Sequence, residues 1–220
     1  MELLFLDTET TGKDDDARLV QLAYAKNNDI PTCQNYKPPV EISVEAMSVH
    51  GITNEHIAEC LPFSVNRPFV QGAIDESILV AHNAAFDVKI LENEGLKVDH
   101  SRVIDTLKVA QHLYDLPQYK LQYLRYYFKL DVAGDAHSAD GDVEVLRALF
   151  NLLKEKISVE EMLTISQHPV LMRRLPFGKY KKQTFEEVTV KDIGYLEWLS
   201  KQADLSEDLK YTLEYWKCPF

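Results

Sequence analysis

The chain has 220 residues, enough for one medium domain with a smaller one, or for one larger domain. Its hydrophobic fraction of 45% and charged fraction of 27% are ordinary for a globular protein with a sizeable core. No apolar run approaches the ~18 residues of a membrane span, and the N-terminus lacks the features of a secretory signal. The three cysteines are far apart, which predicts free thiols in a reducing compartment and hence a cytoplasmic protein.

The formal net charge of −11 argues against a protein that binds nucleic acid, because phosphate binding usually leaves a basic surface. The charge is unevenly placed, however. Residues 1–155 carry 14 basic and 25 acidic residues, whereas residues 156–220 carry 10 of each. Within the second part, the stretch 173–182 holds five basic residues and no acid. The acid therefore lies in the first part, and the second part contains a basic patch with interleaved aromatics.

Short apolar runs predict the strands of the first part. Residues 2–6 indicate a buried strand, residues 18–26 pair with it as a hairpin, and residues 32–36 add a third strand. Two later apolar runs, at 78–81 and 103–105, each lead into a helix. Hairpin-like strands followed by strand–helix alternation predict an α/β fold with a mixed sheet.

Helices are predicted from apolar residues that recur with a period of 3.6. The predicted helices of the first part are 83–94, 105–113, 120–128 and 139–154, and polar helical turns are predicted at 44–49 and 54–59. The second part begins near Ser158, which has the spacing of a capping box with Glu161 and starts a helix to Gln167. A hairpin around Gly178 and two helices, 191–201 and 206–216, complete it. We therefore expect domains at 1–155 and 156–220.

Asp7 and Glu9 are two residues apart at the end of the first strand. Because strand side chains alternate between faces, both project from the same side. Two carboxylates on one face repel each other unless a cation lies between them, and Mg²⁺ and Mn²⁺ prefer oxygen ligands. The spacing alone also occurs in solvated surface pairs, including others in this chain. The preceding apolar strand and the following loop with Gly12 favour a metal site here.

Asp87 follows another apolar strand, in the first turn of the next helix, where ligands of α/β sheets gather. A helix N-terminal acid stabilised by the dipole explains it equally well, and both explanations can hold together. His137 and Asp142 form the last pair. We expect His137 in a loop and Asp142 in the helix that follows, with Ser138 as the N-cap. By spacing alone, His137 would more often be a surface or capping histidine.

Three motifs, FLDTETTG, HNAAFD and HSADGD, occur in this order and together resemble those of the DEDDh exonucleases. The resemblance covers about residues 1–153 and implies an RNase H-like fold, a mixed five-stranded sheet flanked by helices. It also implies a role for each motif residue. The implied metal ligands are Asp7, Glu9, Asp87 and Asp142, and the implied general base is His137. The C-terminal sequence LPFGKYKKQTFEEV further resembles the small α+β module of the exodeoxyribonuclease X branch.

The resemblance implies a metal-dependent 3′→5′ exodeoxyribonuclease with two Mg²⁺ ions, or Mn²⁺, in its site. It would release nucleoside monophosphates from DNA with a free 3′ end, single-stranded or duplex, in DNA repair or end processing. An RNA-trimming 3′ exoribonuclease is the alternative, because discrimination depends on how the site treats the 2′-OH. A non-catalytic nucleic-acid-binding module is the third choice, disfavoured because all five motif residues are present. Protein partners and oligomeric state are not readable from the sequence.

The same resemblance implies residues that hold the terminal nucleotides: Thr10, His50, Asn83 and Phe86. Phe86 either stacks on a base or packs in the core of its helix. Many relatives carry an apolar residue just after the TTG motif, where it can wedge the end of the strand. Lys13 stands there in this chain, followed by three acids, so the handling of a duplex end stays open.

The basic patch of the second part offers two readings. It consists of Arg173, Arg174, Lys179, Lys181 and Lys182, with aromatic residues between them. Such a stretch can grip a nucleic-acid backbone and stack on bases, or it can be a solvated charged hairpin. The sequence does not favour either.

Overall fold

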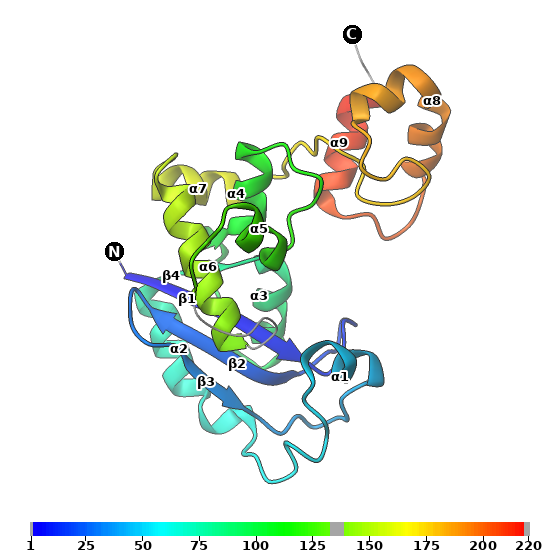
Figure 1. Ribbon diagram of the computed structural model, residues 1–220. Helices are drawn as coiled ribbons and strands as arrows, with labels where there is room; N and C mark the ends of the chain where they lie inside the picture. The colour runs from blue at the N-terminus through cyan, green and yellow to red at the C-terminus, as the bar shows by residue number, and fades with distance from the viewer. Residues whose placement is uncertain (1, 133–138, 218–220) are drawn as a thin grey trace.

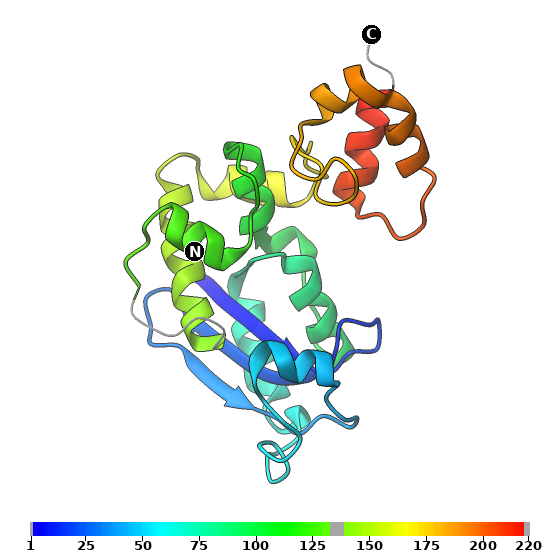
Figure 2. The same cartoon turned by 45° about the vertical axis from the view of Figure 1, so that its right-hand side comes forward.

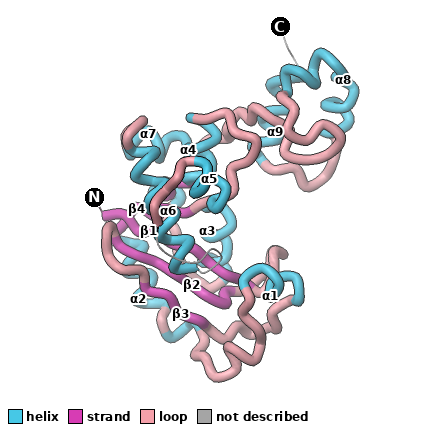
Figure 3. The backbone as a smooth tube through the Cα atoms, viewed as in Figure 1, coloured by secondary structure: helices cyan, strands magenta, loops and turns pink. Residues whose placement is uncertain are grey.

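The computed structural model describes residues 2–132 and 139–217. Its five-stranded sheet has the strand order β3-β2-β1-β4-β5 (Figures 1 and 3). The strands are β1 (Glu2–Thr10), β2 (Leu19–Lys26), β3 (Thr32–Asn35), β4 (Ser77–Ala81) and β5 (Val103–Asp105). β2 and β3 extend the sheet antiparallel on one side of β1, and β4 and β5 extend it parallel on the other. The mixed five-stranded sheet is confirmed, with each strand at its predicted place.

The helices also follow the prediction at most positions. They are α1 (Val44–His50), α2 (Arg67–Glu76), α3 (Ala84–Asn93), α4 (Thr106–Leu113), α5 (Leu121–Tyr127), α6 (Ala139–Lys154), α7 (Val159–Ser166), α8 (Phe185–Leu199) and α9 (Glu207–Lys217). Two 3₁₀ turns lie at Phe63–Val65 and His100–Arg102. The Ser158 capping box starts α7 as predicted, with both reciprocal hydrogen bonds present.

Three segments differ from the prediction. α2 was not predicted, although the turns predicted at residues 54–59 are present. The predicted hairpin around Gly178 is reduced to one antiparallel bridge, between Arg174 and Thr184. α8 begins earlier than predicted because Thr184 and Glu187 form a second capping box. It also kinks at Asp192, whose backbone leaves the helical conformation.

The alternation of side chains along β1 divides the core into two layers. Leu4 and Leu6 pack with buried residues of α2 and α3, whereas Phe5 packs with the apolar face of α6. Figures 1 and 2 show α6 crossing one face of the sheet while α2 and α3 lie against the other. Odd-numbered positions of β1 therefore face α6, and even-numbered positions face α3.

The C-terminal helices have a core of their own. Buried residues of α8, α9 and the segment before them, among them Leu175, Phe185 and Leu213, form a cluster separate from the two layers of the sheet. Hydrogen bonds from Val170 N to Asp208 and from Met172 N to Thr212 attach the connecting segment to α9. Figure 1 shows α8 and α9 standing away from the sheet.

Two further predictions concern membrane spans and cysteines. No helix among them is both long and apolar enough to cross a bilayer. Cys33 and Cys60 are free thiols, and Cys218 lies outside the described range.

Candidate metal centre and nucleotide site

β1 reaches beyond its parallel neighbour, and this overhang carries two carboxylates. The β1–β4 pairing ends at Phe5 with Val80, whereas β1 continues along β2 to Thr10. Asp7 and Glu9 lie in this overhang, inside the strand rather than just after it. Both occupy odd-numbered positions, so both face the side that α6 covers.

Asp142 reaches the same place from the first turn of α6. Carboxylate oxygens of Asp7, Glu9 and Asp142 all lie within 4.8 Å of one another, the one such group of potential metal ligands among the residues that the structure describes. Gln122 of α5 donates a hydrogen bond from Nε2 to Oδ1 of Asp142. The three acids come from two elements that are distant in sequence, so the fold itself assembles the cluster.

Asp87, in the other layer, is outside this 4.8 Å group, but its charge acts on Asp7. It is buried at the start of α3, and Thr8 Oγ1 donates a hydrogen bond of 2.7 Å to its Oδ1. Thr8 lies between Asp7 and Glu9 on the opposite face of β1, toward α3. The stretch Asp7–Glu9 therefore supplies two carboxylates of the cluster and, through Thr8, also contacts the fourth acid, Asp87.

Burial and mutual repulsion disturb the protonation of these acids. Burial raises the pKa of Asp7 well above its ordinary value, and the charges of Asp87, Asp142 and Glu9 raise it further. Burial and Asp142 raise the pKa of Glu9 to about 7. Burial raises the pKa of Asp87 to about 7 against the opposing effect of the Thr8 hydrogen bond, and Asp105 raises it as well. Carboxylates packed this closely ionise together only when positive charge lies between them.

The donor set fits hard divalent cations. It offers only oxygen atoms, from side chains that repel one another, which is the chemistry that Mg²⁺ and Mn²⁺ prefer. No histidine or cysteine belongs to this group among the described residues.

The predicted general base, His137, lies outside the described residues. The described chain resumes two residues later, at Ala139. The backbone N–H of Ala139, at the start of α6, donates to Gln21 Oε1 across 3.4 Å. Gln21 pairs with Glu9 in the β1–β2 ladder, so α6 begins beside the carboxylates.

Three of the four predicted nucleotide-binding residues line one cavity beside Glu9. Thr10, His50 and Phe86 surround a space of about 670 Å³, together with Lys13. Phe86 is half-buried and packs against the core, as the second of its two interpretations expects; that it stacks on a base stays a prediction. His50 has both ring nitrogens engaged: Nε2 lies 3.2 Å from Thr10 O, and Nδ1 accepts from Ile52 N. His50 thus ties α1 to the end of β1.

Asn83, the fourth, lines a different cavity. It adopts a left-handed conformation with φ of 67° at the turn from β4 into α3. The carboxylate of Asp105 holds this turn, accepting from Asn83 N at 3.0 Å and Ala84 N at 3.1 Å. Asp105 also caps α4 through Leu107 N. Neither Asp105 nor Gln122 was singled out from the sequence, although Asp105 shares with Asp7 the signal of an acid at the end of an apolar strand.

The five residues of the basic patch are not equivalent. Arg174 binds Asp115 through two hydrogen bonds of 2.9 Å. Lys179 pairs with Asp192 at 3.1 Å. The remaining three, Arg173, Lys181 and Lys182, are exposed.

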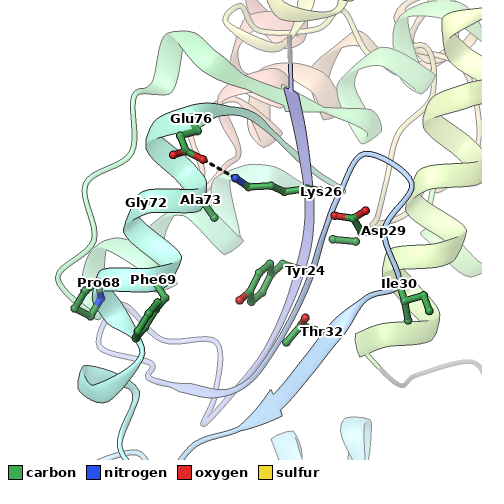
Figure 4. Close-up of a pocket in the computed structure, with 11 residues that line it drawn as sticks. Tyr24, Lys26, Asp29, Ile30, Thr32, Pro68, Phe69, Gly72, Ala73 and Glu76 are labelled. Carbon is green, nitrogen blue, oxygen red and sulfur yellow. Dashed lines mark hydrogen bonds and ion pairs between the residues drawn. The ribbon is translucent and has the colours of Figure 1, made fainter.

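Another cavity lies at the opposite end of β1. It opens between Tyr24 and Phe69, under the turn from β2 to β3 and against α2 (Figure 4). Lys26 of its wall pairs with Leu4 in the ladder, far along the strand from Glu9, and its ammonium group bonds Glu76. Lys26 and Glu76 therefore satisfy each other, and the cavity lies apart from the carboxylate site.

Comparison with known proteins gives consistent results for both parts of the chain. The exonuclease family matches residues 4–150, and the exodeoxyribonuclease X-like C-terminal family matches residues 175–204. Exodeoxyribonuclease 10 of Escherichia coli K12 is 30% identical over 230 residues, covering 97% of this chain and 98% of the relative. The DNA polymerase III epsilon subunit of Rickettsia conorii is 31% identical over 163 residues, covering 67% and 71%. A structure of exonuclease X in complex with 5′-overhanging duplex DNA superposes with a TM-score of 0.63 at 27% identity, covering 74% of this chain and 99% of that one.

Proposed function

The chain belongs to the exonuclease family and is a 3′→5′ exonuclease, and from this premise we propose that it degrades DNA by metal-dependent hydrolysis. The observation that carries the proposal is the oxygen cluster of Asp7, Glu9 and Asp142, whose atoms lie within 4.8 Å of one another. Asp87 completes the set from α3. The names of the similar exodeoxyribonuclease and of the DNA-bound exonuclease X support DNA as the substrate class.

In this proposal the four carboxylates hold two divalent ions, Mg²⁺ or Mn²⁺. Such a pair of ions activates a water molecule and stabilises the leaving oxygen of a phosphodiester. The chain's own acids would hold the ions, and their crowding favours positive charge at the site. This also accounts for the net charge of −11, because part of the acid serves metal rather than facing DNA.

His137 would act as the proton acceptor for the attacking water. An imidazole with an ordinary pKa near 6.5 accepts a proton at neutral pH, which suits a general base. The support for this role is the HSADGD motif, since its Asp142 reaches the cluster. The product would be a nucleoside monophosphate, with Thr10, His50 and Phe86 shaping the space for the terminal nucleotide.

Two broader features belong to the same proposal. We divide the chain into a nuclease domain and a C-terminal domain, as expected, but place the division after α7 rather than at residues 155–158, because α7 packs in the nuclease core. A role in DNA repair or end processing in the cytoplasm suits an enzyme that shortens DNA ends.

The test is degradation of a 5′-labelled single-stranded DNA and of its RNA counterpart, with Mg²⁺, with Mn²⁺ and with chelator. We expect a metal-dependent ladder that shortens from the 3′ end of DNA. A ladder on RNA alone would replace DNA by RNA as the substrate class. No cleavage of either strand in any metal would contradict catalysis altogether.

Two variants separate the proposed roles. Asp7→Ala should lose metal binding and turnover together, whereas His137→Ala should keep metal and DNA binding and lose most turnover, about 100-fold or more. Asp16→Asn is the matched control, because it removes an exposed acid of the neighbouring loop. Wild-type turnover in Asp7→Ala or His137→Ala would refute the corresponding role.

A further inference from the structure

A cavity of about 550 Å³ separates the nuclease part from the C-terminal helices. One wall is the connection from α4 to α5, residues 114–120, and the other is the segment 172–182. Figures 1 and 2 show the α4–α5 connection on the side of the nuclease part that faces the C-terminal helices. The paired hydrogen bonds between Arg174 and Asp115 join the two walls. We call this cavity the interdomain cleft.

The interdomain cleft is basic in a strongly acidic chain. Asp115 of the first wall is engaged by Arg174, and none of the described residues that line the cavity itself is acidic. Its basic lining residues are Lys120, Arg173, Arg174, Lys181 and Lys182. Arg174 is neutralised by Asp115, whereas the other four are exposed and form no ion pair with any described residue. A concave surface lined by one sign of charge concentrates ligands of the opposite sign.

The inner end of the cleft lies about one helical turn from Asp87 of the carboxylate site. Asn83 lines the cleft and caps α3, and Asp87 lies four residues farther along that helix. Four residues correspond to about 6 Å along a helix axis. A strand whose terminal phosphodiester lies at the carboxylates can therefore continue past Asn83 toward the four unpaired cations.

We propose that the interdomain cleft holds the backbone of the substrate DNA strand, several nucleotides upstream of its 3′ end. The cations come from both walls, Lys120 from the nuclease part and the others from the C-terminal part. Each phosphate that they contact releases condensed counterions, which adds affinity without reading sequence. The inference rests on the proposed function, and it assigns to the C-terminal part a share in holding the strand during successive cleavages.

The same geometry divides the basic patch into residues that hold the fold and residues that face the strand. Lys179 does not line the cleft; it pairs with Asp192 and lies 4.6 Å from the centre of the Tyr180 ring. Arg174 has its guanidinium occupied by Asp115. Phosphate contacts are therefore assigned to Lys181, Lys182 and Arg173, with Lys120 opposite.

The experiment compares two double variants of the full chain with equal loss of charge. Lys181→Gln/Lys182→Gln removes two cations of the cleft, and Lys201→Gln/Lys210→Gln removes two exposed cations of the C-terminal part outside it. Binding of a fluorescein-labelled single strand of ~16 nucleotides, the upper range of single-strand sites, is measured by anisotropy with chelator at graded salt. Hydrolysis of a ~4-nucleotide strand in Mg²⁺ reports the carboxylate site alone.

We expect the cleft double variant to bind the long strand about 20-fold more weakly at about 0.1 M salt, with a salt slope lower by about 1.4. The control pair should bind the long strand and hydrolyse the short strand like wild type, whereas the cleft double variant should lose more activity on the long strand than on the short one. Lys120→Gln should weaken long-strand binding as well, by about fivefold.

Equal affinity of the two double variants would overturn the proposal. So would wild-type affinity in Lys120→Gln, because the strand would then lie on the C-terminal part outside the cleft. Failure of wild type to hydrolyse the short strand would instead refute the proposed function, so the two failures are distinguishable. Melting temperatures of all variants verify that the fold is intact.

Discussion

The hydroxyl of Thr8 donates a 2.7 Å hydrogen bond to the carboxylate of Asp87, and so links the central strand to α3. Both residues are buried. Burial raises the pKa of Asp87 to about 7, and the hydrogen bond from Thr8 opposes this shift by favouring the charged form. Thr8 therefore acts on the proposed metal site without being a ligand itself.

Replacing Thr8 by Val should raise the metal concentration needed for half-saturation. Val keeps the volume but donates no hydrogen bond, and a hydrogen bond to a charged group contributes about 1.5–3 kcal/mol, or roughly tenfold or more in affinity. Mn²⁺ binding by calorimetry and the metal dependence of DNA cleavage would both measure the change. Thr8→Ser, which restores the hydroxyl, should return close to wild type. Unchanged Mn²⁺ affinity in Thr8→Val would show that Asp87 does not depend on this bond.

Asp105→Asn should destabilise the turn that carries Asn83. The carboxylate accepts from the N–H groups of Asn83, Ala84 and Leu107, and an amide offers only one oxygen. At least one buried N–H then loses its partner, which costs about 1–3 kcal/mol in the free energy of unfolding. Urea denaturation measures this loss. Asp99→Asn, at an exposed cap that accepts from Ser101 N, should cost less. Equal losses in the two variants would contradict the role given to Asp105.

Much of the carboxylate cluster could be predicted from the sequence because its signals are local. Strand alternation places Asp7 and Glu9 on one face, and the family motifs add Asp87 and Asp142. The partners of these acids could not be found this way. Gln122 meets Asp142 only after α5 packs beside α6, and nothing in the local pattern around Gln122 predicts that contact.

The C-terminal part shows how a local signal can mislead. Gly178 and the alternation of basic and aromatic residues favour a hairpin, yet Tyr180 and Phe185 are buried in a helical core. The capping box of Thr184 and Glu187 has the same spacing as the one at Ser158, from which the start of α7 was predicted. Applied to Thr184, the same rule predicts the observed start of α8. α2 was missed because only Val70 and Ile74 of its residues are buried, too short a stripe for periodicity to reveal.

The protein should lose stability between about pH 7 and pH 5 through His82. Burial lowers the pKa of His82 to about 4, and its Nε2 lies 2.7 Å from Tyr119 O. In the unfolded chain the pKa is about 6.5, so below that pH the unfolded state binds the proton and the folded state does not. The contribution of neutral His82 to the free energy of unfolding is therefore complete above about pH 6.5. It is lost as the pH falls toward 4, and the loss is about 2 kcal/mol at pH 5.

Denaturant unfolding of wild type and His82→Gln at a series of pH values tests this. The variant should show a shallower fall in unfolding free energy between about pH 7 and pH 5, by the same ~2 kcal/mol. His112→Gln, at an exposed position, is the control and should follow the wild-type curve. A variant curve parallel to wild type would exclude His82 as the source.

Asp7→Asn should stabilise the metal-free protein while abolishing cleavage. Burial and the charges of Asp87, Asp142 and Glu9 raise the pKa of Asp7, so its ionised form is unfavourable in the folded state. When the pKa of an acid is higher in the folded than in the unfolded state, the protein loses stability as the pH rises above the unfolded-state pKa. Asn does not ionise and so removes that loss. Since 1 kcal/mol corresponds to roughly 2–4 °C in a chain of this size, Tm with chelator should rise by a few degrees.

Metal should reverse the order of the melting temperatures of wild type and Asp7→Asn. Mg²⁺ or Mn²⁺ stabilises whichever folded chain binds it, so the Tm of wild type should increase with metal and that of Asp7→Asn should increase much less. Thermal melts with chelator and with saturating Mn²⁺ measure both effects, and Asp16→Asn should behave as wild type in each. A lower Tm than wild type for Asp7→Asn in chelator would mean that Asp7 is held by favourable contacts rather than by repulsion. An undiminished metal response in that variant would place the ions elsewhere than at this cluster.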